Sequence, residues 1–321
     1  METRAKSKRA RLNEIVGSWN PDVEVAINKL NDDCLIKIFM FLPIVDRVRI
    51  EGVCKRWRNI SKESWQHFKT LKADLAIWGS DVVFCSPNVL KKFRQLKEFS
   101  FMRSVCSKLS DPFPRIIHSL PTTLKILEMS NLIFSNIDCI GKMNDLEKLT
   151  IYKEDLVTDT FLVTLAENCK KLYHLDISGA KNVTESGIQA ITSLPEIKHL
   201  VLNYLPEITG YNFTYMPKLQ TLCCRGCEHL KDDGLCTLLT MCDLIEFMDL
   251  YGCEQITNVL LKCALNVAKT RTNNLVLHLI LSQDGLFDLR PIYSHDTLLK
   301  ITLLTERESR DEDEDWLFWL L

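Results

Sequence analysis

Three stretches of the chain share one pattern: Leu172-Tyr-His-Leu-Asp-Ile-Ser-Gly-Ala180, Leu219-Gln-Thr-Leu-Cys-Cys-Arg-Gly-Cys227 and Ile245-Glu-Phe-Met-Asp-Leu-Tyr-Gly-Cys253. In each, apolar residues recur as in a strand with one buried face, and a glycine follows where a turn is expected. The first two stretches continue alike into Thr184-Glu-Ser-Gly-Ile188 and Lys231-Asp-Asp-Gly-Leu235, where a helix is expected to begin. The pattern therefore predicts a repeated unit of strand, turn and helix.

The strand pattern L-x-x-L-x-L, with other aliphatic or aromatic residues allowed, recurs nine times beyond residue 90. Successive units start 28, 22, 26, 25, 22, 26, 31 and 22 residues apart, around the period of roughly 20 to 29 residues of leucine-rich repeats. The units resemble the cysteine-containing class of these repeats, which implies an α/β solenoid with a parallel sheet on its concave face and helices on its convex face. The units start at Leu96, Leu124, Leu146, Leu172, Ile197, Leu219, Ile245, Val276 and Leu298.

The thirteen cysteines allow a second interpretation, because Cys224 and Cys227 form a CxxC motif that could hold zinc or carry redox chemistry. The repeat alignment favours a role in the core. It places Cys224 at an inward strand position, matches Cys227 with Cys253, and places Cys242 three residues before its repeat, as Cys169 is. We therefore expect no metal and no cofactor.

His174, His199 and His278 each lie two residues after a repeat start, which places them on the outward side of their strands. A three-histidine metal cluster is one interpretation. Adjacent strands lie about 4.8 Å apart, and His278 is several repeats away, so at most two of the rings can meet. We expect exposed polar contacts instead.

The region from Leu30 onward has helical patterning. Leu35, Ile38, Phe39 and Leu42 form one apolar stripe that ends at Pro43. A second stripe runs from Ile50 to Ile60 with Asp46 as its expected N-cap, and a short third segment carries Trp65 and Phe68. Three short helices in about 40 residues enclose too little apolar area to stand alone, which predicts a neighbour or a partner.

This region resembles the F-box through Leu30-Asn-Asp-Asp-Cys-Leu-Ile-Lys-Ile-Phe39, Leu42-Pro43, Val53-Cys-Lys-Arg-Trp57 and Trp65. The family usually has Leu-Pro at the start of the box, and here Asn31 stands in the place of the proline. The other interpretation is a generic helical subdomain packed on the repeats. The resemblance implies an adaptor-binding module that docks on Skp1, using residues among Leu30, Leu35, Ile38, Phe39, Leu42, Pro43, Ile44, Val53 and Trp57.

The expected organisation is a disordered basic segment at 1–24, an F-box at 25–70, leucine-rich repeats at 71–305 and an acidic tail with an apolar end at 306–321. The first eleven residues include Lys-Ser-Lys-Arg-Ala-Arg, which is either a nuclear-import signal or a solubilising tail. The apolar end, Trp316-Leu-Phe-Trp-Leu-Leu321, is expected either to cap the last repeats or to bind a partner.

Composition excludes several classes of protein. The formal net charge of −2 argues against a dedicated binder of nucleic acid or anionic membranes. No secretory signal, no apolar run of about eighteen residues and no common catalytic motif is present. We expect a non-catalytic protein of the cytoplasm, the nucleus or both.

An F-box followed by leucine-rich repeats resembles the substrate receptors of Skp1–cullin–F-box (SCF) ubiquitin ligases. This resemblance implies three partners, namely Skp1, a cullin held through Skp1, and a target protein, with the chain monomeric within the complex. The alternatives are a non-degradative scaffold and a nuclear binding module steered by the basic N-terminus. Outward strand residues are expected to bind the target, foremost Tyr152, His174, Asp176, His199, Asn203, Arg225, Phe247, Asp249 and Tyr251.

Overall fold

The computed structural model describes residues 26–74, 87–102, 117–130, 137–152, 155–283 and 298–305. Its contacts divide the chain into two compact units, residues 1–67 and 68–321. The expected basic segment at 1–24 and the acidic tail at 306–321 lie outside the described residues. Within the described part, no helix is both long and apolar enough to cross a membrane.

The first unit is helical, but its second apolar stripe forms two helices instead of one. The chain leaves the helical conformation before Cys54, which has extended backbone angles and caps the following helix by accepting from the Trp57 N–H at 3.4 Å. Asp46 is not an N-cap, because its helix already begins after Pro43. The elements are η1 (Ala26–Lys29), α2 (Asp32–Met40), α3 (Ile44–Ile50), α4 (Lys55–Ser64) and η2 (Trp65–His67).

The core of this unit is small. Leu35 and Phe39 of α2 are buried against Ile60 of α4. The ring of Trp57 packs on Phe39, with 5.1 Å between the ring centroids. Trp57 and several other side chains at the edge of this cluster stay only partly buried, so the unit leaves apolar surface accessible.

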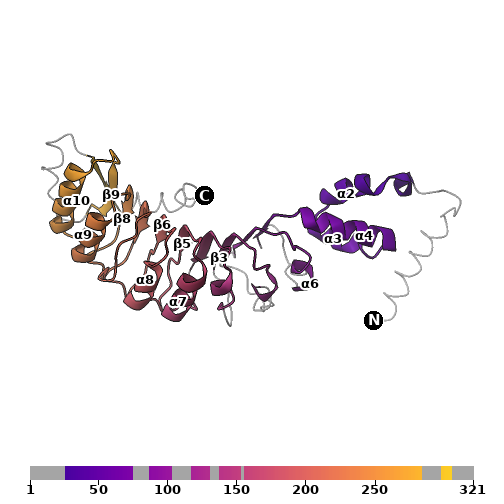
Figure 1. The fold of residues 1–321 in the computed structure, drawn as a ribbon, viewed down its shortest axis with the longest axis horizontal. Helices are drawn as coiled ribbons and strands as arrows, with labels where there is room; N and C mark the ends of the chain where they lie inside the picture. Colours follow the sequence, from indigo (N-terminus) through magenta and orange to yellow (C-terminus); the bar gives the residue numbers. More distant parts are fainter. Residues whose placement is uncertain are drawn as a thin grey trace. The chain divides into compact units, whose positions relative to one another are not determined.

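The second unit contains a parallel sheet in which strands adjacent in the sequence are also neighbours in space (Figure 1). Each predicted repeat start lies two residues before one column of aligned strand residues, for example Leu172 before His174, which confirms the predicted repeat register. The nine predicted units do not include the first strand of the sheet. Its unit starts at Phe68, two residues before Thr70, and has its second apolar position at Leu71. The strands are β1 (Thr70–Asp74), β2 (Glu98–Met102), β3 (Ile126–Ser130), β4 (Lys148–Tyr152), β5 (His174–Asp176), β6 (His199–Val201), β7 (Thr221–Cys223), β8 (Phe247–Asp249), β9 (Leu277–Ser282) and β10 (Leu299–Leu304).

Helices α7 and α8 lie side by side on the convex side of this sheet, as do α9 and α10 (Figure 1), and among the four repeats that contain them the longest repeat has the longest helix. The 31-residue repeat from Ile245 contains the longest helix, and the 25- and 26-residue repeats contain shorter ones. The 22-residue repeat from Ile197, which lies between α8 and α9, has no helix between residues 202 and 220. The helices are α6 (Pro87–Leu90), η5 (Ile117–Ser119), η6 (Ile140–Lys142), α7 (Asp159–Asn168), α8 (Glu185–Ile191), α9 (Asp232–Met241) and α10 (Asn258–Thr270).

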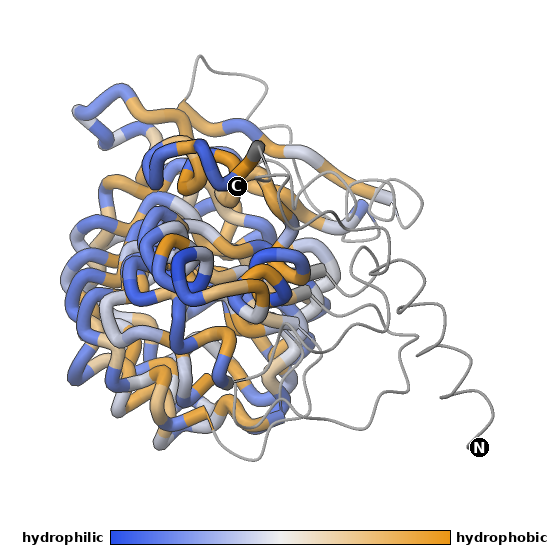
Figure 2. The backbone as a smooth tube through the Cα atoms, turned by 90° about the vertical axis from the view of Figure 1, so that its right-hand side faces the viewer, coloured by the Kyte–Doolittle hydropathy of each residue, from blue (hydrophilic) through white to orange (hydrophobic). Residues whose placement is uncertain are grey.

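The core of the second unit runs between sheet and helices, and hydrophobic and hydrophilic stretches alternate along each coil of the backbone (Figure 2). The cysteines predicted to be core are buried, as are the repeat leucines around them. Two of the thiols bond in equivalent ways to the preceding repeat: Cys227 Sγ donates to the Leu202 carbonyl at 3.1 Å, and Cys253 Sγ donates to the Cys224 carbonyl at 2.9 Å. These thiols therefore fill space and also donate to buried strand-end carbonyls of the preceding repeat.

Candidate protein-docking surfaces

The turn between α2 and α3 exposes apolar side chains. Because Leu35 and Phe39 form the inward stripe of α2, Ile38 and Phe41 fall on its outward side, one helical turn apart. The exposed fraction of Phe41 is 90%, and Met40 and Pro43 beside it are also exposed. We name Ile38, Met40, Phe41 and Pro43 the α2–α3 surface. Adjacent exposed apolar residues of this kind are typical of a protein-docking site.

The structure separates the predicted Skp1-binding residues into three groups. Leu35 and Phe39 are buried in the core, so their expected role as contacts is corrected to a structural one. Ile38, Pro43 and Val53 are exposed, whereas Leu30, Leu42, Ile44 and Trp57 are half-buried. The sequence interpretation missed Met40 and Phe41 because both fall outside the stripe that it followed. A large aromatic residue directly beside an inward stripe was the available signal.

Asn31, where the family usually has proline, is the N-cap of α2. Its side-chain Oδ1 accepts a hydrogen bond from the Cys34 N–H at 2.9 Å. The replacement therefore exchanges the fixed backbone of proline for a side-chain cap, and both suit the start of a helix.

The Val53-Cys-Lys-Arg-Trp57 string has a structural explanation at several positions. Cys54 caps α4, and Trp57 packs on Phe39. The Arg56 guanidinium reaches α2, where Nε and Nη2 donate to Asp32 Oδ1 at 2.9 and 2.7 Å. Nη1 of Arg56 also donates to the Asn28 carbonyl at 2.9 Å. The string thus holds α4 against the start of α2.

A buried arginine connects the α2–α3 turn with the end of α4. Arg47 is fully buried, and its guanidinium donates to the Leu42 and Ser64 carbonyls, each at 3.4 Å. The guanidinium also lies 5.4 Å from the centroid of the Trp65 ring. Burial lowers the pKa of Arg47 to about 10, so the group remains cationic at neutral pH. These contacts hold the turn that carries the α2–α3 surface against the end of α4.

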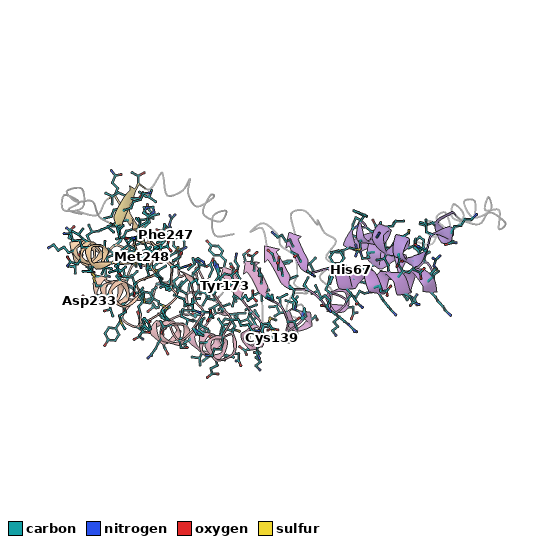
Figure 3. All side chains as sticks on the ribbon, turned by 45° about the horizontal axis from the view of Figure 1, so that its top comes forward. His67, Cys139, Tyr173, Asp233, Phe247 and Met248 are labelled. Carbon is teal, nitrogen blue, oxygen red and sulfur yellow. The ribbon has the colours of Figure 1, made fainter. Side chains whose placement is uncertain are left out.

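Outward strand residues form rows across the concave face of the second unit. One row comprises Thr70, Glu98, Ile126, Lys148, His174, His199, Thr221, Phe247, His278 and Lys300. Strands about 4.8 Å apart bring such neighbours into contact. The His174 and His199 ring centroids are 5.9 Å apart, and the Phe247 ring lies 5.5 Å from that of His278. Figure 3 labels Phe247 of this row and Tyr173, which directly precedes His174 in the sequence.

The expectation of exposed histidines is wrong for His174, whose exposed fraction is 4%. A histidine pair does meet, as the strand spacing allowed. Among the described residues, no group of three or more His, Cys, Asp or Glu side chains could hold a metal ion. Burial lowers the pKa of His174 to about 3, and the nearby Lys148 ammonium and His199 act in the same direction. His174 is therefore a neutral imidazole at physiological pH.

Three of the predicted target-binding residues, His174, Arg225 and Asp249, are buried, which corrects their expected placement at the surface. Large side chains in neighbouring rows cover one another, and spacing along a single strand does not reveal this. The other six predicted residues, Tyr152, Asp176, His199, Asn203, Phe247 and Tyr251, are half-buried.

A cavity of about 300 Å³ opens on the concave face across strands β1 to β6. We name it the β1–β6 groove. Of the residues named foremost for target binding, His174 and His199 line this groove. Its charged and imidazole-bearing side chains are Lys72, Glu98, Glu128, Lys148, His174 and His199.

Comparison with known proteins agrees with this division of the chain. A family profile described as F-box domain matches residues 27–69. Human F-box/LRR-repeat protein 12 is 26% identical, with 54% of this chain and 61% of that protein covered; the mouse protein is 27% identical, with 53% and 61% covered. The chain thus spans about six-tenths of the length of these curated relatives.

Among solved structures, an internalin from Listeria monocytogenes superposes with a TM-score of 0.49 at 12% identity, covering 85% of this chain and 67% of the internalin. The repeat architecture itself rests on the strand order and the register of the parallel sheet. The F-box match at residues 27–69, the named relatives and the repeat register agree with one another: the chain contains an F-box domain and is similar to F-box/LRR-repeat proteins.

Proposed function

We propose that this chain is the substrate receptor of an SCF-type ubiquitin ligase. Its F-box binds Skp1, and through Skp1 a cullin, while its repeats hold a target protein for ubiquitination and proteasomal degradation. In this role the chain performs no covalent chemistry itself. It raises the effective concentration of the target beside the ubiquitin-loaded enzyme and orients the accepting lysine.

The observation that carries the proposal is the α2–α3 surface within a matched F-box domain. Phe41 is 90% exposed, although burial of such a side chain against a partner is worth roughly 1.5 to 3 kcal/mol. Arg47 binds the Leu42 carbonyl, so the turn is held in place before any partner arrives. A rigid apolar anchor loses little conformational freedom on binding, which favours a stable complex.

The test is affinity purification of the tagged full-length chain from cells, with quantification of Skp1 and cullin. We expect both proteins with the wild type and at least a tenfold loss of both with Phe41→Asp, which places a charge in the docked surface. Val259→Asp is the matched control, since Val259 is 54% exposed on α10, in the other unit, and this variant should retain both partners. Skp1 without any cullin would favour the non-degradative scaffold, and equal recovery with Phe41→Asp would contradict the docking assignment.

A further inference from the structure

The β1–β6 groove has the dimensions of a peptide site. Its lining residues come from six successive strands, from Thr70 and Lys72 on β1 to His199 on β6. Five strand spacings of about 4.8 Å give a length of about 24 Å, which accommodates about seven residues of extended chain at roughly 3.3 Å each. A volume of about 300 Å³ is small for a folded domain, whereas an extended segment can lie along successive strands.

The charges along the groove are balanced. Two lysines, Lys72 and Lys148, face two glutamates, Glu98 and Glu128. Lys148 Nζ lies 3.1 Å from Glu128 Oε1, and these side chains are only 10% and 15% exposed, so each charge is already paired. Glu98 accepts a hydrogen bond from Thr70 Oγ1 at 3.1 Å. A strongly charged segment would therefore gain little attraction here and would meet like charge at either sign.

None of the described residues that line the groove is an arginine. Phosphorylated segments are generally bound by clustered arginines, whose planar guanidinium groups donate two hydrogen bonds to one phosphate. The nearly buried Lys148 cannot replace such a cluster without separating from Glu128. The groove is therefore poorly suited to a phosphate group.

The ring of His174 is a polar group in the groove for which the described residues provide no hydrogen-bond partner. His174 lies between Lys148 and His199 in the same row and lines the groove. Only 4% of its surface is exposed. In the part of the chain that the structure describes, no hydrogen bond joins its ring to another residue. A neutral imidazole has one donor and one acceptor nitrogen, so it can bind a peptide group or an uncharged polar side chain.

We propose that the β1–β6 groove binds an extended, unphosphorylated target segment of about seven residues with no net charge, and that His174 exchanges a hydrogen bond with that segment. This inference rests on the proposed function, because it identifies what the receptor recognises. Target recognition at this site then requires no prior phosphorylation, and phosphorylation of the segment would weaken its binding.

The test uses the full-length chain in complex with Skp1 on an array of acetylated, amidated heptapeptides. The array varies Ser, phosphoserine, Gln, Lys and Glu over all seven positions. We expect the bound peptides to have a net charge near zero, and exchange of one serine for phosphoserine to lower the signal at least fivefold. Preferential capture of phosphorylated or strongly charged peptides would overturn the inference.

Two pairs of variants locate the binding on the array. Ser100→Trp fills the groove from β2 and should abolish peptide capture, whereas Lys300→Trp, at an exposed position of β10 outside the groove, should not. His174→Phe should lower capture at least tenfold, whereas His278→Phe, in the same row on β9, should not. Unchanged capture by Ser100→Trp would overturn the inference. Skp1 binding is measured on the same samples. If the wild type binds Skp1 but selects no peptide, only this inference fails. If the wild type does not bind Skp1, the proposed function fails.

Discussion

Arg225 and Asp249 form an ion pair between neighbouring repeats, with Arg225 Nε donating to Asp249 Oδ2 at 3.0 Å and side chains only 4% and 5% exposed. The Arg225 guanidinium lies 5.4 Å from the centroid of the half-buried Tyr251 ring. Two residues predicted to contact a target thus support a third that remains accessible. Loss of this buried ion pair should therefore destabilise these repeats and also move Tyr251 on the concave face.

Replacement of Asp249 by Ala should lower the free energy of unfolding by about 3 to 5 kcal/mol, because it leaves a buried guanidinium without its carboxylate. The double variant Arg225→Met, Asp249→Ala should lose much less than the sum of the losses of Asp249→Ala alone and Arg225→Met alone. Urea unfolding of all four proteins gives this double-mutant cycle. Strict additivity would show that the pair has no energetic role.

The stability of the second unit should fall on acidification because of His174. Its folded pKa, about 3, lies below the ordinary value of 6.5, so the unfolded chain takes up the proton first as the pH falls. The stability from neutral His174 is complete above pH 6.5 and is lost between there and pH 3. From pH 7 to pH 5 the loss is about 2 kcal/mol. Urea unfolding at both pH values should show that His174→Gln removes this part of the loss, and an unchanged loss would contradict the assignment.

The Asn31 cap predicts a modest effect on the first unit. Asn31→Ala should lower the stability of the F-box by about 1 kcal/mol, since the Cys34 N–H loses its acceptor. Asp33→Ala, at an exposed position in the first turn of the same helix, should change it by less than about 0.5 kcal/mol. Hydrogen exchange of the α2 amides compares the two variants. Equal losses would refute the capping role.

Gly226 should resist substitution because its turn lies against the Tyr204 ring of the preceding repeat. Its φ is 66°, and an added Cβ would lie 2.5 Å from the Tyr204 ring. Gly226→Ala should therefore cost more than the roughly 1 to 2 kcal/mol of left-handed backbone alone. In a Tyr204→Ala background the same change should cost only that backbone amount. Thermal unfolding of the four proteins measures the difference, and the same cost in both backgrounds would exclude the contact.

Much of the repeat architecture was predictable because leucines of a parallel solenoid recur at fixed strand positions. All nine predicted starts hold the same register, from Leu96 to Leu298. The unit at Phe68 was not predicted, because its third apolar position holds the small residue Ala73, which the pattern of aliphatic and aromatic residues does not include. The exposed fractions of the concave side chains could not be predicted from the sequence, for another reason. They depend on which residues face one another across strands, and the burial of His174 between Lys148 and His199 appears only after the register is known.

The F-box shows the same limit at a smaller scale. The apolar stripe predicted α2 correctly, yet it placed the buried Phe39 among the docking residues and left out the exposed Phe41, two positions further on. The break between α3 and α4 was missed because Val53 and Cys54 continue the helical spacing. It arises where Cys54 takes the extended backbone of a cap.

The central claim is that the α2–α3 surface docks on Skp1, and calorimetric titration of the purified full-length chain with purified Skp1 tests it most directly. The account predicts one-to-one binding, at least tenfold weaker affinity for Phe41→Asp, and wild-type affinity for Val259→Asp, with both variants as stable as the wild type because both side chains are exposed. No heat of binding with the folded wild type, or an affinity that Phe41→Asp leaves unchanged, would contradict it.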